Sequence, residues 1–149
     1  MRYVHTNIVS HDWRRLADFY VTVFGCTVIP PIRNQSGTWL ADGTGVPGAR
    51  REGAHLLLPG HGPNGPTLEI FQYAQNEDLI PISPNTRGFS HIAFEVVSVE
   101  ATLESIMEHG GQRLGTITRN DVSGVGQLTF VYARDPDGNV LEIQNWSAP

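Results

Sequence analysis

The chain has 149 residues, 40% of them hydrophobic and 17% charged, and these values predict one globular domain with a buried core. A formal net charge of -5 argues against a nucleic-acid partner, no apolar run approaches the roughly 20 residues that span a membrane, and the lack of any lysine excludes Schiff-base chemistry. The lone Cys26, which we expect to be buried, and an N-terminus without a signal-peptide pattern predict a cytoplasmic protein.

The first predicted elements are a strand and a helix. Val4–Val9 is predicted as a strand, and Asp12 is a typical N-cap residue for the helix that follows. Apolar side chains then recur at helical spacing as far as Gly25, a residue that commonly ends helices. These helical positions are Leu16, Phe19, Tyr20, Val23 and Phe24.

The stretch 30–66 is rich in glycine and proline, so it is predicted to be a loop interrupted by short strands. We expect these short strands around Trp39-Leu40 and at His55–Leu58. A loop of this kind often lines a substrate pocket. A last strand with the tripeptide Leu68-Glu69-Ile70 then closes the first half near residue 73.

The second half repeats this order of elements. Ile92–Val97 is predicted as a strand. The helix that follows begins after the N-cap residue Ser98 and ends at Gly110-Gly111. The helical apolar positions are Val99, Leu103, Ile106 and Met107. The remaining segments are expected as strands at Gln112–Thr118, Leu128–Arg134 and Val140–Gln144, with a turn at Asp135–Gly138.

The two halves are related by a weak internal duplication. His91 follows His5 by 86 positions, and each half ends in the tripeptide Leu-Glu-Ile, with Glu142 following Glu69 by 73 positions. We therefore expect an α+β fold of two βαβββ modules, about residues 1–73 and 87–147, joined by a linker at 74–86. The modules would form a single domain, 1–149, whose curved mixed sheet surrounds a metal-binding cleft at the seam.

His5, Glu69, His91 and Glu142 occupy matching places in the duplication. Side chains alternate between the two faces of a strand, so each of the four lies opposite an aliphatic face that suits packing under a helix. A lone histidine or glutamate on a strand is usually structural, but four aligned positions favour one shared site. Two imidazoles and two carboxylates suit a divalent cation, with two waters to complete an octahedron.

Other polar and aromatic residues have weaker patterns. We expect structural or surface roles for the four remaining histidines, His11, His55, His61 and His109. Candidate substrate-pocket residues near the predicted ligands are Asn7, Phe71 and Tyr73, and Trp146 is a further aromatic candidate. Core packing explains the aromatic residues equally well.

The motifs VHTNI, DWRRLADFYVTVFG, TLEIF, GFSHIAFEV and DPDGNVLEI together resemble the vicinal-oxygen-chelate superfamily over nearly the whole chain. This superfamily includes glyoxalase I, methylmalonyl-CoA epimerase, extradiol dioxygenases and fosfomycin-resistance thiol transferases. The filled His/Glu/His/Glu set is closest to that of glyoxalase I. The resemblance implies a metal-dependent lyase or isomerase that abstracts a proton next to a carbonyl, with Glu142 or Glu69 moving the proton.

Several points stay open after this resemblance. An Fe(II) extradiol-type dioxygenase using His5, His91 and Glu142 is one alternative, and a non-enzymatic binder of small molecules such as antibiotics is another. The metal could be Ni, Zn, Co, Mn or Fe. The glycine-rich stretch 30–66 departs from short bacterial glyoxalase I, so no residue is assigned to a thiol cofactor. The resemblance also implies a homodimer, with the site either within one chain or shared between two.

Overall fold

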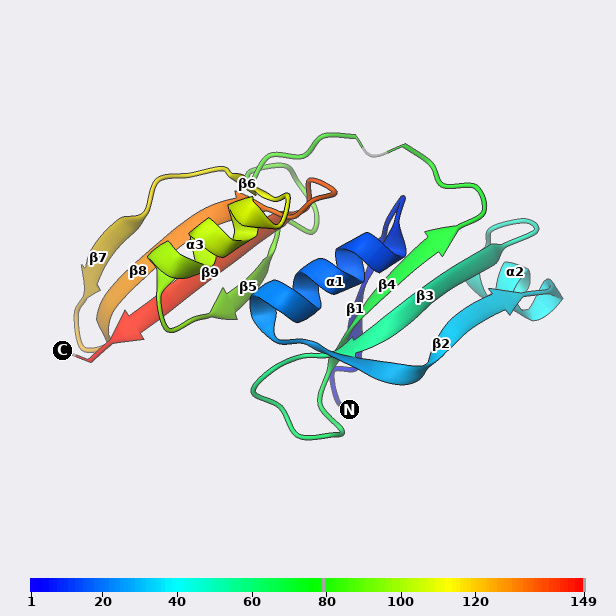
Figure 1. Ribbon diagram of the computed structural model, residues 1–149, viewed down its shortest axis with the longest axis horizontal. Helices are drawn as coiled ribbons and strands as arrows, with labels where there is room; N and C mark the ends of the chain where they lie inside the picture. The colour runs from blue at the N-terminus through cyan, green and yellow to red at the C-terminus, as the bar shows by residue number, and fades with distance from the viewer. Residues whose placement is uncertain (79, 149) are drawn as a thin grey trace. The chain divides into compact units, whose positions relative to one another are not determined.

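The computed structural model describes residues 1–78 and 80–148 and divides the chain into two compact units, Met1–Asp78 and Leu79–Pro149 (Figure 1). Position 79, within the predicted linker 74–86, and position 149, the end of the predicted domain, lie outside the described residues. Each unit contains one mixed sheet, so the expected α+β class with mixed sheets is confirmed. In the described part of the chain, no helix is both long and apolar enough to cross a membrane.

The first unit contains a four-stranded sheet in the order β1-β4-β3-β2. β1 pairs in parallel with β4, and the other neighbours are antiparallel. Helix α1 packs against β2, β3 and β4 (Figure 1). The elements are β1 (His5–Val9), α1 (Trp13–Phe24), β2 (Thr27–Ser36), α2 (Thr38–Thr44), β3 (Arg50–Leu57) and β4 (Thr67–Tyr73).

Helix α1 forms where the sequence predicts it. The side chain of Asp12 accepts a hydrogen bond from the backbone N–H of Arg15 at 3.1 Å, which satisfies one of the free donors of the first turn. Gly25 ends the helix in the left-handed conformation, at φ 70°. The buried face, which includes Leu16, Phe19 and Tyr20, forms the core against the sheet.

The prediction of a strand at Trp39-Leu40 is wrong, because these residues lie in helix α2. The backbone N–H groups of Leu40 and Ala41 both donate to the carbonyl of Gly37, which starts a helical turn. Gly45 ends it in the left-handed conformation. Leu40 is 2% exposed and anchors the short helix, whereas Trp39 is 60% exposed. Burial of Leu40 therefore outweighs the strand preference of Trp39.

The second unit repeats the arrangement, since its first strand, β5, pairs in parallel with its last, β9. Its sheet has the order β5-β9-β8-β6, and β7 pairs with β8. Helix α3 packs against β8 and β9, and the Ser98 hydroxyl caps it at the N–H of Ala101. The elements are β5 (Ile92–Glu95), α3 (Val99–Glu108), β6 (Gln112–Arg113), β7 (Thr118–Val122), β8 (Gly126–Arg134) and β9 (Val140–Ser147).

Candidate metal-binding half-sites

The first half-site is centred on the carboxylate of Glu69 in β4. Its Oε1 lies 3.3 Å from Nδ1 of His5 and 3.3 Å from Nε2 of His55. β4 lies between β1 and β3, so one imidazole reaches the carboxylate from each neighbouring strand. His55 is the direct cross-strand partner of Glu69, and Asn7 is its partner on β1. The Glu69 side chain is 11% exposed, whereas both imidazoles that contact it are more open to water.

The second half-site has the same chemistry in the other unit. Oε2 of Glu142 in β9 lies 3.1 Å from Nε2 of His91, which directly precedes β5. Tyr132 in β8 is the cross-strand partner of Glu142, and its ring centroid lies 4.9 Å from that of His91. The Glu142 side chain is 15% exposed. Each unit therefore has a His–Glu contact at the positions that the duplication predicts, His5 with Glu69 and His91 with Glu142.

Burial and nearby charges set the protonation of two further side chains. Burial lowers the pKa of His55, and although Glu69 raises it, Arg33, His5 and Arg51 lower it further. Burial also raises the pKa of Tyr132, as do the charge of Glu142 and a hydrogen bond with it. We infer that His55 is a neutral imidazole near pH 7 and that the Tyr132 hydroxyl keeps its proton and donates to Glu142.

The four predicted ligands lie in two pairs, His5 with Glu69 and His91 with Glu142. Among the described residues, no group of three or more His, Cys, Asp or Glu side chains is arranged as a complete cation site. The chemistry of each pair fits a divalent ion, because both carboxylates contact imidazoles rather than arginines. Each unit therefore supplies two donors of a kind that a borderline metal prefers.

Asn7 and Phe71, two of the predicted pocket residues, lie beside the first half-site, whereas Tyr73 lies at the far end of β4. The side-chain amide of Asn7 donates to the backbone carbonyl of Glu69 at 3.3 Å. Phe71 is fully buried in its unit, with its ring 5.8 Å from that of His55. The hydroxyl of Tyr73 accepts a hydrogen bond from Arg51 at 3.4 Å. Trp146 lies in β9, four residues after Glu142, and its cross-strand partner in β8 is Leu128.

The remaining histidines and the cysteine lie apart from these pairs. His11, His61 and His109 are exposed, and His109 bonds the carbonyl of Ser105 near the end of α3 at 2.8 Å. His55 is the exception, because β3 brings it to Glu69. Cys26 is buried as predicted, and burial raises the pKa of its thiol to about 11.

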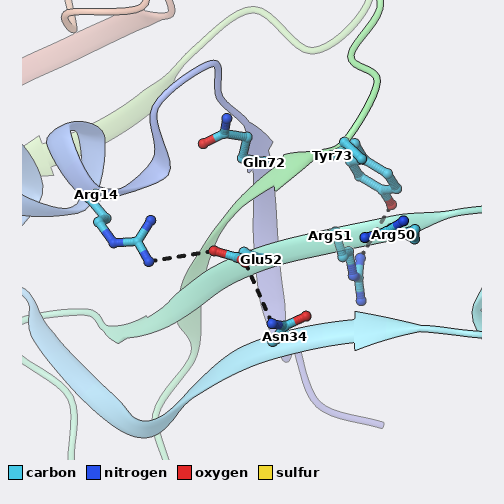
Figure 2. A pocket seen from close by; sticks show the side chains of 8 residues that line it. Arg14, Asn34, Arg50, Arg51, Glu52, Gln72 and Tyr73 are labelled. Carbon is cyan, nitrogen blue, oxygen red and sulfur yellow. Dashed lines mark hydrogen bonds and ion pairs between the residues drawn. The ribbon is translucent and has the colours of Figure 1, made fainter.

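The first unit contains a cavity of about 280 Å³ beside β2, β3 and β4 (Figure 2). Three arginines and one glutamate line it, so its formal charge is positive. Arg14 and Asn34 approach Glu52 from either side, each at 3.5 Å. The complete lining is Arg14, Asn34, Arg50, Arg51, Glu52, Gln72, Tyr73 and Ala74. We call it the arginine cavity.

Comparison with known proteins supports the relationship that the motifs indicate. The model of the Glyoxalase/Bleomycin resistance protein/Dioxygenase superfamily matches residues 2–143. No curated protein matches the chain.

Solved structures share the fold at low sequence identity. A glyoxalase family protein from Bacillus cereus has a TM-score of 0.83 at 16% identity, over 99% of this chain and 95% of that one. A glyoxalase family protein from Enterococcus faecalis has a TM-score of 0.58 at 24% identity, over 97% and 95%. A glyoxalase I variant from Zea mays has a TM-score of 0.64 at 24% identity, over 96% of this chain and 44% of that one.

Proposed function

The chain belongs to the Glyoxalase/Bleomycin resistance protein/Dioxygenase superfamily, and within it we propose a metal-dependent lyase or isomerase of the glyoxalase I or acyl-CoA epimerase type. It would abstract a proton next to a carbonyl of a small substrate. The observation that supports this most is the matched His–Glu contact in each unit, His5 with Glu69 and His91 with Glu142. We propose that these four side chains hold one divalent ion.

The bound ion would supply Lewis-acid stabilisation of negative charge on the substrate oxygen. The proton itself would move to a carboxylate of this chain, Glu142 or Glu69. The hydroxyl of Tyr132 would orient the Glu142 carboxylate, and the imidazole of His55 would hold that of Glu69. Both candidate bases are thus held by a second side chain of their own unit.

Glu69 is the reason for proposing proton transfer rather than oxygenation. Extradiol dioxygenases and thiol transferases of the superfamily that the chain resembles bind their metal with two histidines and one glutamate. This chain has a second carboxylate at the fourth position. That carboxylate is largely buried and in contact with His5, which supports a role as the fourth ligand. We also propose that the protein is a cytoplasmic homodimer.

Hydrogen exchange from solvent tests this function. In D₂O, the metal-loaded protein is expected to introduce deuterium next to the carbonyl of a hemithioacetal of a 2-oxoaldehyde or of a branched acyl thioester, without oxygen uptake. Glu142→Gln should slow the exchange by about a hundredfold or more, because it removes a candidate base. The control Glu104→Gln, on the exposed face of α3, should keep the activity. Oxygen consumption coupled to turnover with Fe(II) would contradict the proposal.

A further inference from the structure

Arg51, Phe71 and Tyr73 continue the row of side chains that begins at the first half-site. Along β4, Glu69, Phe71 and Tyr73 occupy alternate positions and so share one face of the sheet. Their cross-strand partners on β3 are His55, Gly53 and Arg51, in that order. The row therefore runs from the carboxylate of Glu69 across the Phe71 ring to Arg51, on a single face.

The Phe71 ring forms a platform for the guanidinium of Arg51. Gly53 makes this possible, since a Cβ there would lie 2.6 Å from Cδ1 of Phe71. The Arg51 Cζ lies 4.0 Å from the centre of the Phe71 ring, while His55 meets the same ring edge-on. Stacking on an aromatic face holds a guanidinium in place while leaving its N–H edge available.

Two neutral groups hold Arg51 without neutralising its charge. Its Nε donates to the side-chain oxygen of Gln35 at 2.8 Å, and its Nη1 donates to the hydroxyl of Tyr73 at 3.4 Å. A guanidinium has five N–H donors, so these two bonds leave three. Within residues 1–78 and 80–148, no carboxylate forms an ion pair with Arg51. A partly buried cation in this state favours an anion from outside the chain.

The nearest carboxylate in the sequence is directed elsewhere. Glu52 follows Arg51 in β3, so its side chain lies on the opposite face of the sheet, where Arg14 pairs with it at 3.5 Å. Arg51 itself lines the arginine cavity together with Arg50 and Tyr73, and Figure 2 shows Arg50, Arg51 and Tyr73 close to one another. The Arg51 residue is itself only partly buried, so an anion from solvent can reach it.

We propose that Arg51 binds an anionic oxygen group of the substrate, a carboxylate or a phosphate, while the reacting carbonyl lies at Glu69. This inference rests on the proposed function for the position of the carbonyl. Phe71 is two residues from Glu69, which corresponds to about 7 Å along a strand. The substrate would therefore have its anionic group several bonds from the carbonyl, and neutral analogues would bind poorly.

Titration of the metal-free full-length protein tests this site without reference to catalysis. In ¹⁵N-labelled protein treated with chelator, succinate and inorganic phosphate are added separately while the Nε–Hε resonance of Arg51 is followed. A saturable shift with a Kd below about 10 mM is expected for at least one of them, as for a charge-assisted contact, and the better ligand identifies the group. No saturable shift with either ligand would overturn the inference.

Variants separate this site from general charge effects. Arg51→Met lacks the Nε–Hε group, so its titration is followed through the backbone amides of β3 and β4. It keeps a long side chain over Phe71 and should weaken binding about tenfold or more. Arg51→Lys keeps the charge but loses the planar fork, so it should bind less well than the wild type. Arg119→Met removes an arginine that is already paired with Glu100 in the other unit, and it should bind normally. Equal losses in the Arg51 and Arg119 variants would contradict a specific site.

The two hypotheses fail independently in these experiments. A chain that binds no metal and catalyses no exchange would still show the anion-dependent shift if Arg51 is an anion site. A metal-loaded, active chain with an unresponsive Arg51 would overturn only the inference about the substrate.

Discussion

At the scale of single residues, Glu69 is the most informative side chain of the first half-site. A carboxylate with 11% of its side chain exposed needs partners, since an isolated buried charge is costly. Its partners are two imidazoles, His5 and His55, which both contact the same oxygen. An arginine would satisfy the charge better if stability were the only requirement. We expect imidazole partners rather than an arginine for a carboxylate that must keep an oxygen available to coordinate a metal ion.

Cys26 provides a prediction about protonation at the same scale. Burial raises its thiol pKa from 9.0 to about 11, so at a given pH below 9 the folded chain holds about a hundredfold less thiolate than the unfolded chain. Alkylation by iodoacetamide at pH 8.5 should therefore be at least about a hundredfold slower in the native protein than in concentrated urea. The chain has one cysteine, so labelling is unambiguous. Comparable rates in the two states would show that the thiol is accessible.

The sequence predicted the residues of each His–Glu pair but not their neighbours. Matching positions in the duplication identify His5, Glu69, His91 and Glu142. An internal repeat can be recognised by comparing the two halves of the sequence, without a structure. His55 and Tyr132 join the pairs only through cross-strand register, Glu69 with His55 and Glu142 with Tyr132. Register depends on turn geometry and on which faces are buried, so the sequence alone does not show these partners.

At the scale of elements, the pairing of β3 with β4 depends on Gly53. A Cβ at this position would overlap the carbonyl oxygen of Ile70 and lie 2.6 Å from Cδ1 of Phe71. Gly53→Ala should therefore lower the free energy of unfolding by about 2 kcal/mol, because the sheet must shift to admit the methyl group. Urea unfolding measures this change.

Gly62→Ala is the matched control for this variant. An added Cβ at Gly62 has no neighbour within 4 Å. Its effect on the free energy of unfolding should stay within about 0.5 kcal/mol, as for most surface substitutions. Equal stability of the two variants would show that the close approach of β3 to Phe71 is not required.

The elements also show which sequence patterns were reliable. Helices α1 and α3 combine an N-cap residue with apolar side chains at helical spacing, and both form as predicted. Strand β7 was missed beyond Thr118 because its sequence, TRNDV, is polar and mostly exposed. It is held by its antiparallel pairing with β8 rather than by a buried face of its own. The strand propensity of these polar residues therefore does not predict β7.

At the scale of the whole molecule, each unit has half of the proposed metal site. In our proposal the two pairs hold one ion, and they can belong to one chain or to two. The predicted linker 74–86 is long enough not to force pairing within one chain. We propose a homodimer in which the first unit of one chain completes the site with the second unit of its partner.

Mixing inactive variants tests this exchange. If the site is shared between chains, a heterodimer of His5→Ala and His91→Ala has one site with both lesions and one intact site. Some activity should therefore return after the subunits have been shown to exchange. With sites within one chain, every site keeps one lesion and activity stays absent. A purely monomeric protein in the ultracentrifuge would also exclude sharing.

The metal content of the purified chain tests the central claim most directly. Elemental mass spectrometry of full-length protein, prepared without chelator, should find about one divalent ion per chain and identify it. His5→Ala and Glu142→Ala, one from each half-site, should both lose most of that ion, because each deprotonated ligand contributes to affinity. His11→Ala and Glu104→Ala, which change exposed residues, should retain it. An unchanged content in both half-site variants, or no ion in the wild type, would contradict the assignment.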